Sequence, residues 1–380
     1  MYGGSYTRQD LAAPTLPTIM DKNLKMPSAW KSSLALDAKL PGGIKATVEG
    51  IYSKDLTSVK THILGIESEQ LQLPGEPQSR IQWVAEKDAN GQYLLNRNGD
   101  TVFPYYLTNS SVNGFYASVT AQLQKDFDFG LSLMAAYTWS ESQSLGEGWG
   151  DQVTSSFSAL NYAKDGSNVE ELGRSGFVPP HRFIANISYR VNEGRWGTST
   201  FGLFYEGYNL CYIGNYSYSR MSYVMGDQDE NALAGDSGAL QLIYIPTREE
   251  LASMPFSSEE NKAAYEAFIA GDKYLSKHRG EYSRRGYVAA PWYSRFNFRF
   301  TQDFHFPVAD QIHTIQVGLD INNVANLLNR NWGLPERVDT DTVLRYDTDT
   351  NQYTYMPQTW SKYASTYSTW NMLLSVRYFF

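Results

Sequence analysis

The sequence has no long apolar run. Nowhere in its 380 residues does a stretch approach the 18 or so consecutive apolar residues of a membrane-spanning helix. This excludes a helical membrane protein. It does not exclude a membrane β-barrel, because the alternating strands of a barrel average out on any hydropathy scale.

Cysteine and clustered positive charge are nearly absent as well. Cys211 is the single cysteine, which excludes an internal disulfide and a thiolate metal cluster. The net charge is −8 and no basic run occurs, so nucleic acid is not expected as a partner. Met1 is followed by YGGSYTRQD, which has neither the basic nor the apolar region of a signal peptide. The protein is therefore expected either to be cytoplasmic or to lack its true N-terminal region.

What the sequence has in quantity is alternation of apolar and polar residues. The period of two is typical of β-strands, and each run is long enough for the roughly 9–11 residues that a tilted strand needs to cross a bilayer. The runs that alternate in this way are 30–40, 44–56, 114–126, 131–142, 181–191, 197–209, 291–303, 312–323 and 369–380.

The connections between these runs are short and long in turn. The short ones are 41–43, 127–130, 192–196 and 304–311, and the long ones are 57–112, 144–180, 210–290 and 324–368. Short turns at one end and long loops at the other are typical of outer-membrane barrels. The predicted fold class is therefore all-β: an antiparallel transmembrane β-barrel segment of about nine long strands, with short periplasmic turns and long extracellular loops.

The apolar faces of several runs end in tyrosine or tryptophan, as the interfacial girdles of barrels do. In the last run, Trp370, Met372, Leu374, Val376, Tyr378 and Phe380 are expected to face lipid. The alternative is a secreted or cell-surface β-sandwich that serves as a binding module or adhesin. Such a sandwich uses the same alternation with one face in a core.

One helix is expected, over about 257–270 in the longest loop. Ser257 or Ser258 can cap it, acidic residues fill its first turn, and Tyr265, Phe268 and Ile269 form an apolar stripe. The stripe indicates structural packing, and a ligand lid is the alternative.

Several segments resemble one family. They are PHRFIANISYR, LIYIPTREEL (242–251), KHRGEYSRRGYVAAPWYSRFNFRFTQDF (277–304), IQVGLDINNVANLLN (315–329) and the terminal VRYFF. In order and spacing they resemble the C-terminal barrel half of TonB-dependent outer-membrane receptors, in the Oar-like branch that carries a carboxypeptidase-regulatory-like domain.

The resemblance implies a TonB-dependent transporter or receptor in the outer membrane, and no enzyme. Extracellular loops would capture an unknown, large ligand, and TonB would then drive movement of a plug. The implied partners are outer-membrane lipid, TonB and the barrel-insertion machinery. The terminal Tyr378 and Phe380 resemble the insertion signal of such barrels.

The family's barrels have more strands than the runs visible here, so residues 1–380 are expected to be the C-terminal part of one barrel domain, a fragment without the plug and the N-terminal strands. The runs 30–40 and 369–380 are then expected to lack a neighbour on one side.

Residues that could bind the ligand lie in the long loops, where aromatic rings suit glycans, peptides or protein partners and arginines suit anionic groups. The candidates are Trp149, Tyr216, Tyr218, Arg279, Arg284, Arg285 and Trp360. Packing of the rings within the loops, and pairing of the arginines with nearby acids, are the alternatives.

The acidic segment 225–238 is the one candidate metal site. Asp227, Asp229, Glu230 and Asp236 could supply oxygen ligands to calcium, although the spacing is not that of an EF-hand. A solvated acidic loop is the alternative, and no other cofactor is expected.

Overall fold

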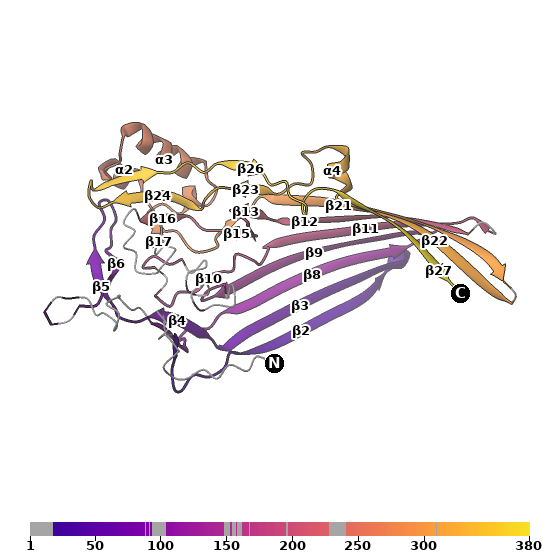
Figure 1. Ribbon diagram of the computed structural model, residues 1–380, viewed down its shortest axis with the longest axis horizontal. Coiled ribbons are helices and arrows are strands. Elements are labelled where there is room, and N and C mark those ends of the chain that lie inside the picture. Colours follow the sequence, from indigo (N-terminus) through magenta and orange to yellow (C-terminus); the bar gives the residue numbers. More distant parts are fainter. Residues whose placement is uncertain are drawn as a thin grey trace, which may run out of the picture.

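In the computed structural model, long strands lie side by side in one antiparallel sheet (Figure 1). The structure describes residues 18–87, 89–90, 92, 104–147, 153, 157, 162–166, 168–194, 197–227, 241–308 and 310–380. In sheet order the long strands are β2 (Ser28–Leu40), β3 (Ile44–Thr57), β8 (Phe115–Asp126), β9 (Leu131–Ser144), β11 (His181–Asn192), β12 (Thr198–Asn209), β21 (Trp292–Val308), β22 (Gln311–Asn322) and β27 (Asn371–Phe379). The short β10 (Gly173–Arg174) pairs with β9. We call this the long sheet.

Each long strand coincides with one of the alternating runs, so the all-β prediction is confirmed. The predicted link 304–311 is wrong, because β21 continues to Val308 and β22 already begins at Gln311. Alternation continues through FHFPV, and Pro307 is tolerated because it lies next to the hairpin end, opposite Ile312.

The two ends of the long sheet differ. The connections 41–43, 127–130, 193–197 and 309–310 lie at one end, which we call the turn end, and the C-terminus lies there too (Figure 1). The connections 58–114, 145–180, 210–291 and 323–370 gather at the other, which we call the loop end.

The two faces of the long sheet differ in polarity. On one face Val119 lies opposite Trp139, and Ala121 lies opposite Tyr137. On the other, the hydroxyls of Thr120 and Thr138 are 2.9 Å apart. We call these the apolar face and the polar face.

The apolar face is not buried. Leu34 is 80% exposed, Leu123 is 52% exposed and Leu374 is 69% exposed. In a β-sandwich, side chains at such positions would interdigitate with a second sheet. The described part of the chain therefore does not support the sandwich alternative.

Within the described residues the long sheet is open, with β2 and β27 at its edges. This confirms the prediction that the first and last runs lack a neighbour on one side. Both strands run from the loop end to the turn end, so direct pairing of β2 with β27 would be parallel. The rest of the sheet is antiparallel, so the long sheet cannot close into a barrel by continuing its antiparallel hydrogen-bond ladder.

The long connections carry short strands and helices of their own. The strands are β1 (Thr18–Met20), β4 (Val59–Ile63), β5 (Ile66–Leu71), β6 (Arg80–Ala85), β7 (Tyr105–Asn109), β13 (Cys211–Ile213), β14 (Tyr216–Tyr218), β15 (Arg220–Met221), β16 (Val224–Asp227), β17 (Gln241–Leu242), β18 (Tyr244–Ile245), β19 (Glu281–Tyr282), β20 (Val288–Ala289), β23 (Glu336–Val338), β24 (Thr342–Asp347), β25 (Gln352–Tyr355) and β26 (Trp360–Lys362). The helices are α2 (Arg248–Ser253), α3 (Glu259–Gly271) and α4 (Val324–Leu328), with single turns of 3₁₀ helix at Pro41–Gly43 and Leu275–Lys277.

These elements form one body, the loop assembly. The order β17-β16-β24-β25 joins the third and fourth connections in a single sheet, and β1-β7-β4 forms another. A hydrophobic core lies beneath them: Leu73, Tyr223, Met225, Ile243, Ile245, Leu251, Met254, Phe256, Tyr265, Ile269, Leu275, Val343, Leu344, Tyr346, Tyr353 and Tyr355. The long loops are therefore packed against one another.

The predicted helix is confirmed as α3. The hydroxyl of Ser258 accepts a hydrogen bond from the backbone N–H of Asn261 at 3.1 Å, and Tyr265 and Ile269 are fully buried. This burial supports structural packing and not a lid. No described helix is both long and apolar enough to cross a membrane.

The prediction of a single helix was incomplete, because α2 and α4 also form. A capping box begins α2: Glu250 N–H donates to the Thr247 hydroxyl, and Thr247 N–H donates to the Glu250 carboxylate. The Thr-x-x-Glu pattern was therefore a readable signal for this helix.

Candidate functional site

A recess of about 380 Å³ opens on the polar face of β11, β12, β21 and β22. Gly202 lies between Ser188 and Arg299 in the cross-strand register, and its missing side chain leaves the floor of the recess open. Six of the eleven residues that line it carry an amide or a hydroxyl: Asn186, Ser188, Thr200, Asn297, Thr301 and Asn322. Such a surface can exchange hydrogen bonds with a polar, hydrated solute.

Several charged side chains on the same face form ion pairs. Arg299 Nε lies 3.5 Å from Asp320 Oδ1 within the recess. Nearer the loop end, the carboxylate of Glu206 bridges two arginines, at 2.5 Å from Arg182 and 3.1 Å from Arg295. The polar face is therefore hydrophilic without a large excess of one charge along these strands.

Two of the predicted ligand-binding residues are exposed and share one face of a small sheet. Tyr216 is 50% exposed and Trp360 is 41% exposed. The register runs Tyr216–Ile213–Val338–Trp360 across the order β14-β13-β23-β26, so the two rings lie at opposite edges of that sheet. Ile213 and Val338, which lie between the two rings in this register, pack in a hydrophobic core. The two exposed rings at the edges, which we call the surface platform, are the clearest candidates for ligand contact on the loop assembly.

The structure places other candidates inside the loop assembly. Tyr218 is 8% exposed and stacks on Phe177, and Arg285 is 4% exposed. Arg279 pairs with Glu266 at 2.8 Å, which is the alternative considered for the arginines. Because these three residues are buried or paired, they are not part of the surface platform.

Arg284 lies at the surface of the loop assembly, and its guanidinium is 5.6 Å from the ring centroid of Tyr287.

Trp149, Asp229, Glu230 and Asp236 lie outside the described residues, and the backbone of Asp227 ends β16. Elsewhere in the described part of the chain, no three histidine, cysteine or acidic side chains gather where a metal ion could be held. The calcium site remains a prediction.

The terminal aromatics lie at the turn end. Tyr378 is 53% exposed and Phe380 is 88% exposed, with their ring centroids 5.8 Å apart. Tyr378 also stacks with His313 on the neighbouring β22. Their role in insertion remains a prediction.

Residues 4–352 match the family model for the outer membrane beta barrel domain. The chain belongs to this family. No curated protein and no solved structure matches it.

Membership in the outer membrane beta barrel family locates the protein in the outer membrane. It also assigns the two faces of the long sheet. The apolar face, with exposed side chains such as Leu36 and Val376, is the surface that contacts lipid. The polar face, with its recess and paired charges, is the interior surface of the barrel wall.

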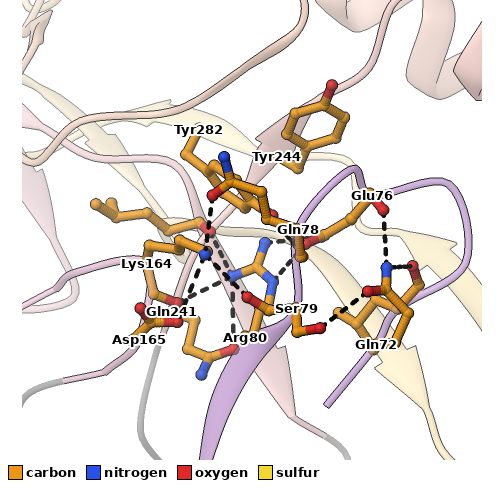
Figure 2. Close-up of polar contacts among 12 residues, drawn as sticks. Gln72, Glu76, Gln78, Ser79, Arg80, Lys164, Asp165, Gln241, Tyr244 and Tyr282 are labelled. Carbon is orange, nitrogen blue, oxygen red and sulfur yellow. Dashed lines mark hydrogen bonds and ion pairs between the residues drawn. The ribbon is translucent and has the colours of Figure 1, made fainter. Parts of the chain in front are cut away.

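A clamp of polar side chains holds the barrel's loops together (Figure 2). Arg80 is fully buried and makes two parallel hydrogen bonds to Glu76, with Nε 2.7 Å from Oε2 and Nη2 2.8 Å from Oε1. Its Nη1 also donates to the carbonyls of Leu242, at 2.9 Å, and Lys164, at 3.2 Å. One guanidinium therefore ties three of the long connections together.

Neighbouring contacts extend the clamp (Figure 2). Lys164 Nζ donates to the Ser79 carbonyl at 2.9 Å, and the Tyr282 hydroxyl donates to Glu76 Oε2 at 3.0 Å. Asp165 Oδ1 accepts from the Ile81 backbone N–H at 2.9 Å. Sequence reasoning missed this cluster, because its members lie in three separate loops and no periodic pattern connects them.

Lys60 in β4 is buried, and we expect it to make stability depend on pH. Burial and the nearby Arg285 lower its pKa to about 8, while Glu170 opposes the shift. An unfolded lysine has a pKa of about 10.4, so between these two values the unfolded chain binds more protons. Burying the charged Lys60 therefore lowers the free energy of unfolding by its full amount below pH 8. This loss of stability shrinks as the pH rises through 8 toward 10.

Lys60→Met should remove this cost. We expect the variant to be about 1–3 kcal/mol more stable than wild type at pH 7, with the difference shrinking by pH 10. Chemical unfolding at both pH values measures it, with Lys22→Met, at an exposed lysine, as the control. Equal gains at both pH values would contradict the assignment.

Proposed function

We propose that this chain forms wall, lumen lining and extracellular loops of a TonB-dependent outer membrane transporter that binds and imports a large substrate. The observation that carries the proposal is the loop assembly, in which the long connections pack into one body at a single end of the barrel wall, and the first, third and fourth of them share a hydrophobic core. A passive pore needs no such body, whereas a receptor needs a rigid surface that recognises a ligand.

The parts of the chain would then have separate roles. The loop end would be extracellular, and Tyr216 and Trp360 would contact the ligand first. The polar face, with the recess around Gly202 and Arg299, would line the path through the barrel. The step driven by TonB is implied by the resemblance alone, and no covalent chemistry on the substrate is proposed.

The alternatives are a passive pore and an adhesin. The uncovered apolar face disfavours a sandwich adhesin, as does the family. A barrel that only adheres would bind ligand at the loop assembly without importing it, and a passive pore would import without an energy source. Uptake of the ligand, and the dependence of that uptake on energy, therefore separate the three functions.

The test compares cells that carry the gene with a deletion strain. The probes are fluorescent peptides from a casein digest and fluorescent dextran oligosaccharides, each size-selected so that the probe is too large for general porins. We expect gene-dependent periplasmic accumulation of one probe class, abolished by a protonophore. Uptake that persists with the protonophore would indicate a passive pore, and surface binding without uptake would indicate an adhesin.

The platform has its own variant. Tyr216→Ala should weaken binding of the accumulated probe several-fold, because the exposed ring would stack on it. Tyr367→Ala, at an 89% exposed tyrosine in another connection, is the matched control. Equal loss in the two variants would argue against the platform.

A further inference from the structure

The recess on the polar face lies about halfway along the barrel wall. Asn186, Phe204 and Arg299, which line it, stand near the middle of β11, β12 and β21. These strands and β22 each have a neighbour on both sides in the long sheet (Figure 1). The volume of about 380 Å³ is toward the lower end of the roughly 300–1,000 Å³ typical of small-molecule sites. The recess can therefore hold a small ligand or one part of a longer one.

The recess is formed before any ligand arrives. On both sides of Gly202, β12 keeps an unbroken register with β11 and β21. On the opposite, apolar face, aromatic rings pack in pairs behind it, with centroids 5.0 Å apart for Phe201 and Phe300 and 4.8 Å apart for Tyr205 and Phe296. Neither this backbone nor these rings have to become ordered on binding, so the entropic cost of binding is small.

Part of the lining has unused hydrogen-bonding groups. Asn297 Oδ1 accepts a hydrogen bond from a backbone N–H at 2.9 Å. By contrast, the side chains of Asn186, Ser188 and Thr200 make no hydrogen bond to other residues in the described part of the chain. An amide and two hydroxyls can all donate as well as accept. They are available to a ligand that also carries both kinds of group.

The charges that line the recess cancel. Arg299 and Asp320 are the charged residues among its lining, and Arg299 Nε lies 3.5 Å from Asp320 Oδ1. Their side chains are 52% and 28% exposed, so both remain accessible. A carboxylate accepts a hydrogen bond from one hydroxyl, and an adjacent guanidinium donates to the next. The pair therefore suits a neutral ligand with hydroxyls on neighbouring carbons.

Phe204 adds an apolar surface to this polar lining. The register places it on the polar face between Asn186 and Asn297, and its side chain is half-buried. An aromatic ring offers a flat face with partial negative charge, against which C–H groups pack well. A sugar ring has such a C–H face and carries its hydroxyls around the edge. The lining matches both features.

The same lining disfavours other classes of ligand. Peptides commonly bind by adding a strand to the edge of a sheet, whereas the strands of the recess are interior. An anionic ligand needs an unpaired cation, but Arg299 is paired with Asp320. A wholly apolar ligand would remove water from the free groups of Asn186 and Ser188 without replacing their hydrogen bonds.

We propose that the recess is a subsite for a neutral oligosaccharide and holds about one or two of its rings. Phe204 stacks on the C–H face of a sugar ring, and the Arg299–Asp320 pair and the free amide and hydroxyls bind its edge. This names the substrate class of the proposed transporter. It rests on the proposed function, because the polar face is taken as the import path.

The test is saturation-transfer difference NMR on the purified full chain in detergent. The probes are maltotriose, isomaltotriose, cellotriose, mannotriose and xylotriose, with tetraglycine and citrate for comparison. We expect a saturation signal from at least one trisaccharide, strongest at the ring protons that face Phe204, and none from citrate. No signal from any of the trisaccharides would overturn the proposal.

A variant that fills the recess locates the binding site. In Gly202→Val the added Cβ would come no closer than 3.8 Å to its nearest neighbours, and valine favours a strand, so we expect the fold to be kept. The dissociation constant of the bound trisaccharide should rise about ten-fold or more.

Gly50→Val is the matched control, because Gly50 lies on the apolar face of β3, opposite Leu34, and a Cβ there meets nothing within 4 Å. Its dissociation constant should equal that of the wild type. Equal affinity in the two variants would mean that the sugar binds elsewhere, for example at the surface platform, and would overturn the proposal.

The subsite and the transport function can fail separately. Energy-dependent uptake of the casein peptides, with no trisaccharide bound by the purified chain, would overturn the subsite and leave transport standing. Trisaccharide binding that Gly202→Val abolishes, in cells that accumulate neither probe class, would support the subsite and overturn the transport function.

Discussion

Glu76→Gln should destabilise the loop assembly more than any other single substitution at its polar contacts. The amide keeps the shape of the side chain but leaves the fully buried guanidinium of Arg80 without its counter-charge. Breaking a buried ion pair in this way typically costs about 3–5 kcal/mol. Hydrogen exchange of backbone amides in β17 and β18 would measure the loss, because both strands lie in the connection that Arg80 holds.

The double variant shows whether the cost comes from the stranded charge. Glu76→Leu with Arg80→Met removes both charges, and we expect it to be more stable than Glu76→Gln alone. Arg248→Met, at a 77% exposed side chain paired with Glu266, is the control and should change stability by less than about 1 kcal/mol. A Glu76→Gln protein as stable as this control would show that the clamp does not hold the loops.

The second large effect is expected on the apolar face of β8. Ala121→Arg places a charge in the lipid-facing row between Val119 and Leu123, near the middle of the strand. An arginine at the bilayer midplane of a barrel costs about 2–4 kcal/mol. Urea unfolding in phospholipid vesicles, followed by the heat-dependent shift in gel mobility, measures this cost.

The neighbouring residue supplies the matched control. Gln122 lies on the polar face, opposite Thr47, and Thr47 donates a hydrogen bond to Asp37. Gln122→Arg therefore places the same side chain in a hydrated region near a carboxylate, and we expect little change. If the two variants lose equal stability, the assignment of the faces is wrong.

The long sheet could be predicted well from the sequence, because each of its strands has one face toward lipid and the other toward the polar interior of the barrel. Alternation such as Val119–Thr120–Ala121 follows directly from the period of a strand. The error at residues 304–311 arose where proline and aromatic residues follow one another near a hairpin. There the composition resembled a turn although the ladder continued.

The loop assembly was much less predictable. Its core joins residues such as Leu73, Ile243 and Tyr353, which are far apart in the sequence, and its strands are too short to show a period. The one helix with a strong stripe, α3, was predicted, whereas α2 required attention to the capping pair Thr247 and Glu250.

The candidate binding residues differ in exposure, and the sequence did not show which of them are buried. An aromatic in a loop can be exposed, as Tyr216 is, or buried, as Tyr218 is, although the two are separated by a single residue of one short strand. Sequence alone gives the residue type. Both rings lie on the same face of β14, and Tyr218 is buried because it packs in a hydrophobic core with Cys211 and Met221, whereas Tyr216 lies beside the turn that joins β13 to β14.

The central claim is that the long sheet is the wall of an outer membrane barrel, with its apolar face in lipid. Single cysteines at positions 119 to 124 of β8 test it directly in native outer membranes. Cys211 does not interfere, because it is fully buried and burial raises the pKa of its thiol to about 12. A charged maleimide should label positions 120, 122 and 124, and positions 119, 121 and 123 should react only with a lipid-soluble reagent. Uniform labelling along the strand, or the opposite alternation, would contradict the account.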